Sequence, residues 1–260
     1  MEREPPGAAL TDDAALGGRL RLRQPARGHR FGHDAILLAA ATHAEAGEVA
    51  VELGAGVGAA GLALARRVDG LDVRLVEIDA ELAHLAADNA ARNGLAARVS
   101  AHALDVGAPP DAFAAAGLAP QSADRVIMNP PFRAAGRAQA SPDARRRAAH
   151  VAAPGALATW LGTAARLLRP DGTLVLIHHA DALAEVLGLL EPAFGGVAIQ
   201  PVHPKPDAPA IRILVRAIRG GRAPLALVPA LVLNGADGRP TAQADAVLRE
   251  GQTLPLAQLA

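Results

Sequence analysis

Apolar runs and segments rich in alanine and leucine alternate along most of the chain. Short continuous apolar runs are typical of buried strands, whereas longer segments with apolar residues at helical spacing predict helices. The expected strands span 49–53, 72–77, 97–102, 124–128, 173–178, 197–202 and 211–218. The expected helices span 33–43, 57–68, 80–93, 152–168 and 181–191.

This alternation predicts an α/β fold with a doubly wound, mostly parallel sheet of about seven strands. Such sheets bind ligands at the carboxyl ends of their strands. Residues 1–18 are expected to be loose, and 133–149 to form a long polar connection. We expect a single domain over residues 1–260, with an N-terminal segment at 1–44 and a C-terminal extension at 221–260.

Composition limits the classes of protein that fit. Hydrophobic residues make up 51% of the 260 residues, enough for a sizeable core, and aromatic residues only 2%, so that core must be aliphatic. The absence of cysteine excludes disulfides, thiolate chemistry and cysteine metal sites. The N-terminus carries no apolar signal segment, and no apolar run reaches the ~18 residues of a membrane span. The sequence therefore predicts a cytoplasmic protein without a membrane segment.

The 26 Lys and Arg residues balance the 26 Asp and Glu residues, so the whole chain has no net charge that would attract nucleic acid. The local distribution of positive charge therefore matters more. Any single arginine is as well explained by a solvated surface with ordinary ion pairs. The cluster that follows the 124–128 strand would border a site at the carboxyl edge of the sheet, where arginine can contact phosphates. The three clusters are Arg19, Arg21, Arg23, Arg27 and Arg30; Arg133, Arg137, Arg145, Arg146 and Arg147; and Arg212, Arg216, Arg219 and Arg222, which follow Lys205, the one lysine.

A proline-rich tetrapeptide, Asn129-Pro130-Pro131-Phe132, directly follows the 124–128 run. The two prolines fix the backbone, so the Asn129 amide and the neighbouring carbonyls are held in one geometry. An amide oxygen and a proline carbonyl can together accept both hydrogens of a planar NH₂ group, and Phe132 can stack on the ring that carries it. Two such acceptors favour the pyramidal nitrogen that can attack. The alternative is a strand followed by a turn without chemistry.

A glycine-rich turn, Gly54-Ala55-Gly56-Val57-Gly58, separates the 49–53 strand from the next helix. Glycines let the backbone approach a ligand closely at such a turn. Glu77 ends the following strand, 21 residues after Gly56, where an acidic side chain accepts hydrogen bonds from ribose hydroxyls. The spacing Gly54-x-Gly56-x-x-Ala59 also fits a nicotinamide dinucleotide site, so the turn by itself leaves the nucleotide open.

Two further carboxylates favour a different cofactor. Glu52 stands just before the glycines, where it can face an ammonium group and where a dinucleotide would place a repelled pyrophosphate. Asp105 follows the third strand and can accept from an adenine amino group. Three carboxylates at three successive strand ends suit a zwitterionic adenosine ligand.

With these motifs the chain resembles the class I S-adenosylmethionine-dependent methyltransferases of the NPPF type, whose members act on amino groups. The resemblance implies a Rossmann-like methyltransferase sheet with an antiparallel last strand, and S-adenosylmethionine as cofactor. Gln24-Pro25 and the segment 28–40 look like the tRNA1(Val) adenine-N6 methyltransferase family, and the likeness covers residues 10–220. The motifs that carry it are Glu52-Leu53-Gly54-Ala55-Gly56, Glu77-Ile78-Asp79, Asp105 and Asn129-Pro130-Pro131-Phe132.

The resemblance assigns expected roles to the cofactor residues. Gly54 and Gly56 would pass close to the methionine part, and Asp34 would help to close that end. Glu52, where many relatives carry Asp, would face the ammonium group. For the adenosine part, the expected contacts are Glu77 to the ribose, Ile78 to the adenine ring and Asp105 to the adenine amino group.

The resemblance also implies the reaction, methyl transfer to adenine N6 in RNA with tRNA as the expected RNA. Asn129 and Pro130 would hold the target amino group, with Pro131 and Phe132 completing the turn. The residues expected to contact nucleic acid are Arg133, Arg145, Arg146, Arg147 and Lys205. No metal is expected, because no histidine pair has ligand spacing with a carboxylate partner; a monomer is favoured.

Three alternatives stay open. The same proline-rich device occurs in guanine-N2 enzymes and in enzymes that methylate a glutamine amide (N5) of release factors. A non-catalytic RNA-binding module that keeps the fold is the third. Against the release-factor activity, the sequence shows no separate N-terminal substrate-binding domain. Against a non-catalytic module stands the intact Asn129–Phe132 tetrapeptide.

Overall fold

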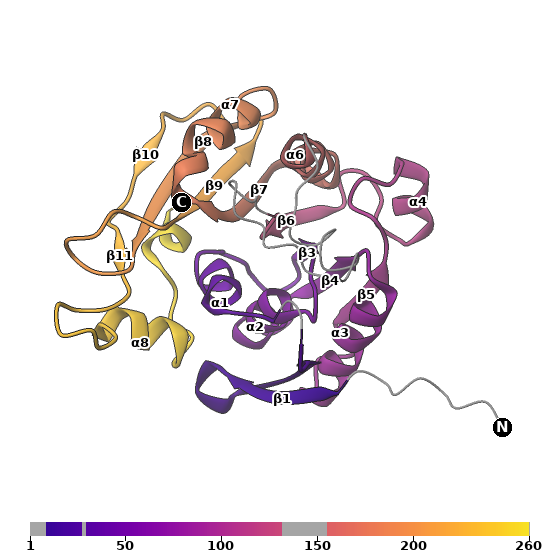
Figure 1. Ribbon diagram of the computed structural model, residues 1–260. Helices are drawn as coiled ribbons and strands as arrows, with labels where there is room; N and C mark the ends of the chain where they lie inside the picture. Colours follow the sequence, from indigo (N-terminus) through magenta and orange to yellow (C-terminus); the bar gives the residue numbers. More distant parts are fainter. Residues whose placement is uncertain (1–8, 28–29, 132–154, 260) are drawn as a thin grey trace.

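The computed structural model describes residues 9–27, 30–131 and 155–259 (Figure 1). Within these residues a nine-stranded sheet has the order β10-β8-β9-β7-β6-β3-β4-β5, and β11 also pairs with β8. Only β9 runs antiparallel within that sheet, against both β7 and β8. The bounds of its strands are β3 Val49–Leu53, β4 Asp72–Glu77, β5 Val99–Ala103, β6 Ala123–Met128, β7 Leu168–His179, β8 Phe194–His203, β9 Arg212–Arg219, β10 Ala226–Leu227 and β11 Leu231–Val232.

The expectation of a mostly parallel, doubly wound sheet is confirmed, with the seven expected strands in the order β5-β4-β3-β6-β7-β9-β8. The short strands β10 and β11 add a parallel edge along β8 that the sequence did not predict. Strand β7 begins before the expected range 173–178, because residues 169–172, whose Arg-Pro-Asp-Gly sequence is typical of a turn, lie inside it, with a φ of 61° at Asp171.

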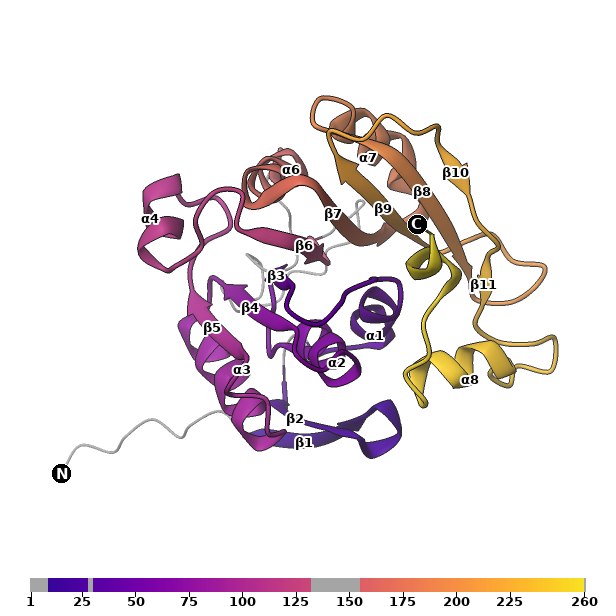
Figure 2. The ribbon, with the colours of Figure 1, turned by 180° about the vertical axis from the view of Figure 1, so that it is seen from behind.

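Helices cover both faces of the sheet (Figures 1 and 2). One face packs against α1 (His33–Ala40), α2 (Ala59–Arg67) and α3 (Ala80–Arg92), and the other against α4 (Pro110–Ala115), α6 (Ala156–Leu167) and α7 (Leu183–Leu190). Each face has its own apolar cluster, and both are mainly aliphatic, as the composition predicts. Short 3₁₀ helices lie at Leu16–Gly18, Ala180–Ala182 and Pro255–Gln258.

The N-terminal residues are more ordered than expected. The prediction that 1–18 are loose is wrong for its second half, because β1 (Leu10–Ala15) pairs antiparallel with β2 (Leu20–Pro25). Alternate side chains of β2 are buried, and its backbone is fastened to α3. The Asn93 side chain bonds both the N–H and the C=O of Arg21, and Asn89 does the same for Arg23. On the edge of β2 that does not pair with β1, two asparagines one helical turn apart thus bond the backbone groups that a second strand would otherwise bond.

The C-terminal extension packs back onto the sheet and α1. Its helix α8 (Ala242–Leu248) contacts α1, and the Leu254 N–H donates to the Ala40 carbonyl at 2.9 Å. Leu231, Val247 and Leu254 belong to the apolar cluster on the α1–α3 face. These contacts support the proposal of one domain over the whole chain. Among the described residues, none of the helices has the length and apolar character needed to cross a membrane.

Candidate active site

The turns that follow β3 and β6 lie side by side at the carboxyl edge of the sheet. These strands are parallel neighbours with Leu53 opposite Met128, so Gly54 and Asn129 leave adjacent strands at the same level. β4, with Glu77 at its end, flanks β3 on the other side, and β5 follows. The topology therefore brings the glycine turn, two of the acidic strand ends and the Asn129 turn to one edge.

The glycine turn has the backbone that its residues predict. Gly54, Gly56 and Gly58 have φ values of 70°, 54° and 83°, a region that L side chains rarely adopt. A Cβ on Gly56 would meet nothing within 4 Å, whereas one on Gly58 would press on Leu75 at 2.9 Å. Open space for a ligand thus lies beside Gly56.

Gly54 has a different neighbour. A Cβ there would lie 2.3 Å from the indole of Trp160 on α6, so the close approach that this glycine permits is to a side chain of the protein. Sequence reasoning missed Trp160, although it is the one tryptophan of a chain with 2% aromatic residues. The expectation that Gly54 also passes close to the methionine part stays a prediction.

Glu52 points under the glycine turn toward α2. It points to the same face of β3 as Ala50, and its Oε2 accepts the Gly61 N–H of α2 at 2.7 Å. The side chain is only 5% exposed. Burial raises the pKa of Glu52 to about 8, the Gly61 hydrogen bond opposes this, and the nearby Glu77 adds to it. Glu52 is therefore a buried cap of α2 that holds a proton below about pH 8 and becomes a carboxylate above it.

Glu77 fastens the glycine turn to the end of β4. Its Oε2 accepts the Gly56 N–H at 2.7 Å and its Oε1 accepts the Asp79 N–H at 3.0 Å. Each carboxylate oxygen can accept two hydrogen bonds, so capacity for two hydroxyl groups remains. The next residue, Ile78, has a 67% exposed side chain, which leaves an apolar surface beside this carboxylate.

Asp105 lies just beyond β5, in the loop before α4. Its Oδ1 accepts the Gly107 N–H at 2.8 Å. The same loop is fastened to α6, because the Thr163 hydroxyl donates to the Val106 carbonyl at 2.9 Å. Asp105 thus occupies the strand end next to that of Glu77, in the place that the sequence predicts.

Asn129 carries the most unusual atom of the site. Its Oδ1 is buried and has no hydrogen-bond partner among the described residues. Leaving a buried acceptor without a partner costs about 1–3 kcal/mol, so such atoms call for an explanation. Pro130 beside it is buried and Pro131 is partly exposed, and neither can donate to that oxygen.

Two expected residues lie further along the same edge. Asp34, in the first turn of α1, accepts the Arg212 Nε–H at 2.9 Å and so joins α1 to the start of β9. Lys205 follows β8, roughly 15 Å from β6 if three strand spacings separate them. Phe132, Arg133, Arg145, Arg146 and Arg147, and the whole predicted connection 133–149, lie outside the described residues.

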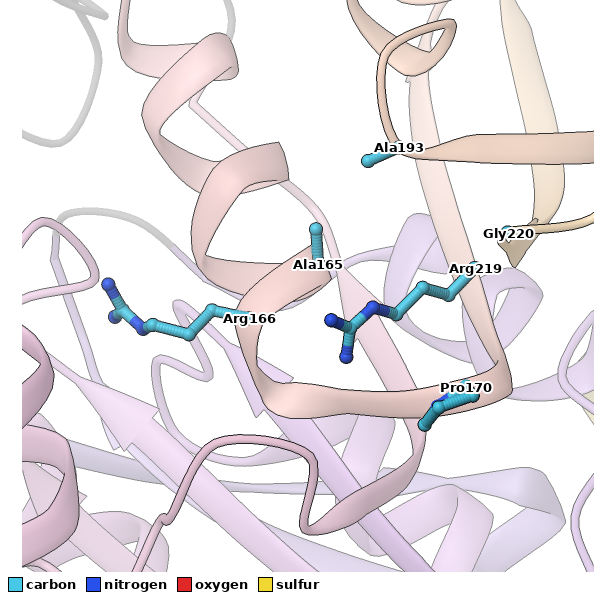
Figure 3. A pocket seen from close by; sticks show the side chains of 6 residues that line it. All are labelled: Ala165, Arg166, Pro170, Ala193, Arg219 and Gly220. Carbon is cyan, nitrogen blue, oxygen red and sulfur yellow. The ribbon is translucent and has the colours of Figure 1, made fainter.

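A hollow of about 420 Å³ lies at the opposite edge of the sheet. Figure 3 shows Arg219 pointing into it and Arg166 turned away. Arg219 donates to the Leu168 carbonyl, and the Arg166 guanidinium lies 4.9 Å from the ring centre of Phe113. The start of β7 and the end of β9 form this hollow, so it is separate from the candidate site. In the described parts of the chain, no group of three or more His, Asp or Glu side chains is placed to hold a metal.

The fold and the glycine turn define the class, an S-adenosylmethionine-dependent methyltransferase with a Rossmann-like sheet. The particular family follows from the sequence profile of the methyltransferase small domain, which matches residues 31–202. The chain belongs to this family.

Relatives agree with this class. The chain is 27% identical over 227 residues to the tRNA1(Val) (adenine(37)-N6)-methyltransferase of Dickeya chrysanthemi, covering 85% of this chain and 87% of that protein. The crystal structure of a predicted O-methyltransferase from Agrobacterium tumefaciens matches with a TM-score of 0.72 and 29% identity, over 85% of this chain and 98% of the other. TYW2 of P. horikoshii in complex with MeSAdo, at 13% identity, shares the fold with a TM-score of 0.54 over 83% of this chain and 73% of its own.

S-adenosylmethionine is the cofactor of this class, and the residues of the site fit it. The open space beside Gly56 leaves room for the ligand. The buried carboxyl of Glu52 complements an ammonium group, and Glu77 keeps acceptor capacity for two hydroxyls. Ile78 presents an apolar surface for a flat ring. When bound, the cofactor supplies a methyl group activated by attachment to a sulfonium.

Proposed function

We propose that the protein transfers a methyl group to N6 of adenine in RNA, with tRNA as the substrate. The observation that carries the proposal is the buried Oδ1 of Asn129, which lies next to the glycine turn and has no partner in the described part of the chain. A hydroxyl group has only one hydrogen to donate, whereas an NH₂ group has two, one for this acceptor and one for the neighbouring Pro130 carbonyl. The arrangement therefore favours an amino group over an alcohol as methyl acceptor.

The proposed roles follow the strand ends. Glu77 accepts from the ribose hydroxyls, Asp105 from the cofactor adenine's amino group, and Ile78 packs on its ring. Glu52 faces the ammonium group, and Gly56 provides the close approach. Gly54 also lies near the methionine part, whose end Asp34 helps to close.

At the target, Asn129 Oδ1 and the Pro130 carbonyl take one hydrogen each from the amino group and favour a pyramidal nitrogen. The N–C bond forms as the sulfur–methyl bond breaks, and the methylated nitrogen loses a proton to water. Catalysis is positioning and polarisation, which needs no separate base. Pro131 keeps the turn rigid and Phe132 stacks on the base, which must leave its stack to enter the pocket.

The names of the relatives agree on methyl transfer but differ in the group that is methylated. The Dickeya protein is named for adenine N6 in tRNA, whereas the Agrobacterium structure is described as an O-methyltransferase. The adenine assignment here rests on the Asn129 turn and the first of these names. An oxygen acceptor, a guanine N2 or a protein glutamine amide are the outcomes that a direct test must separate.

The test is incubation of the protein with methyl-labelled S-adenosylmethionine and, separately, total tRNA or a release factor. We expect label in the tRNA, recovered after digestion as N6-methyladenosine. Label in N2-methylguanosine, in a 2′-O-methyl nucleoside or in the release factor would replace the proposal by the corresponding activity. Loss of label transfer in Asn129→Ala protein is the matched control for a contaminating enzyme.

The arginines at 145–147 supply a second prediction on the RNA substrate. We propose that Arg145, Arg146 and Arg147, with Arg133 and Lys205, contact phosphates around the target base. Replacing 145–147 together by Gln should weaken tRNA binding and flatten its salt dependence, because fewer counterions are released. Arg239→Gln, at an exposed turn of the C-terminal extension, is the control. If the salt dependence of tRNA binding does not change, the three arginines do not contact phosphates and belong to an ordinary solvated surface.

A further inference from the structure

Trp160 connects helix α6 to the cofactor turn. A Cβ built on Gly54 would lie 2.3 Å from its Cη2, 2.9 Å from Cζ3 and 3.3 Å from Cζ2. These three atoms form the outer edge of the benzene half of the indole. The ring therefore meets Gly54 by its outer edge.

The helix that carries Trp160 is fixed at this place. Thr163, one turn further along α6, donates to the Val106 carbonyl at 2.9 Å. Thr159 Cγ2 lies 3.6 Å from where a Cβ of Gly107 would be. One side of α6 thus contacts both the glycine turn and the loop of Asp105. Trp160 itself is only half-buried, so part of its ring remains accessible beside the site.

The described phenylalanines lie in or against the two apolar clusters. Phe113 and Phe194 are 1% and 7% exposed within the cluster on the α4–α6–α7 face, and Phe31 packs against the cluster on the opposite face. Trp160 is the aromatic side chain that lies against Gly54. An aromatic face attracts a cation placed within about 6 Å of its centre, and indole does so most strongly.

We propose that Trp160 is a positioning residue that holds the sulfonium of S-adenosylmethionine against its indole face and so distinguishes the charged cofactor from the neutral product. In the reaction the electrons of the broken carbon–sulfur bond remain on sulfur, the methyl group passes to the acceptor nitrogen, and that nitrogen releases a proton. The sulfur thereby loses its charge, the attraction to Trp160 disappears, and S-adenosylhomocysteine leaves more easily. The inference rests on the proposed cofactor site and is independent of the RNA substrate.

The test compares the dissociation constants of S-adenosylmethionine and S-adenosylhomocysteine by calorimetry, without any substrate. Trp160→Leu keeps an apolar side chain but removes the π face. We expect it to weaken S-adenosylmethionine binding about threefold to tenfold more than S-adenosylhomocysteine binding. Trp160→Phe should lie between the wild type and Trp160→Leu. Because Trp160 is the one tryptophan, its fluorescence in the wild type should also change differently with the two ligands.

Two controls separate this role from packing and from a misplaced site. Leu161→Ala, next to Trp160 and 3% exposed, loosens α6 without removing the indole and should leave the ratio of the two constants unchanged. Glu77→Ala should weaken both ligands alike. If Glu77→Ala binds both ligands normally, the cofactor site itself is wrong. If Glu77→Ala loses them while Trp160→Leu leaves the ratio unchanged, only the role of Trp160 is overturned. Should Trp160→Leu fail to fold, the role of Trp160 is overturned equally by an unchanged ratio in Trp160→Phe together with identical fluorescence changes for both ligands in the wild type.

Discussion

The turns after β3 and β6 are neighbours of opposite character. In the glycine turn the Ala55 N–H donates to the Val76 carbonyl, the Gly56 N–H to Glu77 and the Gly58 N–H to the Ala55 carbonyl. In the turn after β6 the Asn129 Oδ1 has no partner among the described residues. A hydrogen-bonded scaffold suits a cofactor that returns in every cycle. An unsatisfied acceptor suits a group that must be captured and then released.

The largest expected effect breaks the second turn. Asn129→Ala removes the unpartnered acceptor and should lower single-turnover methylation of tRNA, at saturating cofactor, by about a hundredfold or more. Cofactor affinity should not change, because the lost contact is made to the substrate and matters chiefly in the transition state. Thermal stability should be retained, since the deleted Oδ1 accepts no hydrogen bond from the described residues.

Asn93→Ala is the matched control for that experiment. Asn93 uses its amide to bond the Arg21 backbone, so its loss should lower stability and leave the methylation rate unchanged. A near wild-type rate in Asn129→Ala would mean that the β6 turn is only a turn. The amino-methyltransferase assignment would then lose its main support.

The second prediction separates the two glycines of the first turn. In Gly54→Ala an L side chain would be strained at the positive φ of this position, and its Cβ would clash with Trp160. The substitution should lower the free energy of unfolding by about 3 kcal/mol. Gly94→Ala has a similar φ of 72° with nothing within 4 Å, so it measures the strain alone, about 1–2 kcal/mol. Denaturant unfolding compares them. Equal losses would show that Trp160 yields easily.

Gly56→Ala should resemble Gly94→Ala in stability, because its Cβ would also point into open space. Unlike Gly94→Ala, it should weaken S-adenosylmethionine binding, since that space is the proposed place of the ligand. Calorimetry on both variants decides it. Normal binding by Gly56→Ala would move the cofactor away from this glycine.

Much of this comparison could be read from the sequence. Each strand–turn–helix unit is local, so the apolar runs placed Glu52, Glu77, Asp105 and Asn129 at successive strand ends, and parallel pairing then gathers them. The order of the motifs also indicated the family. Local patterns thus carry the positions of the site, though not the contacts between its parts.

What the sequence did not reveal depends on contacts between distant segments. Trp160 reaches Gly54 only through the packing of α6, and β2 is held by asparagines of α3. The alternation of Leu20 and Leu22 with arginines is a period-two signal for a strand, in a stretch between the loose 1–18 segment and the 33–43 helix for which no element was expected. The hydrogen bond of Glu52 to Gly61 had a weaker signal in the sequence. Glu52 lies two residues after Ala50 and so points to the same face of the strand, the face that α2 covers.

The third prediction tests the bond between the turn and β4. Glu77→Ala removes the acceptor of the Gly56 and Asp79 N–H groups as well as the proposed ribose contact. Cofactor binding should weaken by about 1–3 kcal/mol, and stability should fall as well. Glu77→Gln, which keeps one acceptor oxygen, should lose less of both. Unchanged affinity in Glu77→Ala would exclude Glu77 from the cofactor site.

The smallest expected effect concerns the charge beneath the glycine turn. Burial raises the pKa of Glu52 from 4.5 to about 8, so between these values the folded state holds a proton that the unfolded state has released. The free energy of unfolding should therefore fall as pH rises through this window. Glu52→Gln keeps an oxygen for the Gly61 N–H and should lack this fall, as thermal unfolding across the window will show.

The same titration should appear in cofactor binding if Glu52 faces the ammonium group. An ionised Glu52 attracts that group, so binding releases a proton and affinity should rise with pH in the wild type. The cofactor's own amino group titrates equally with both proteins, and comparison with Glu52→Gln cancels it. We expect wild-type affinity to gain a few-fold more than that of Glu52→Gln between about pH 6 and pH 8. Parallel profiles would show that Glu52 only caps α2, and the turn after β3 would then hold its ligand without this carboxylate.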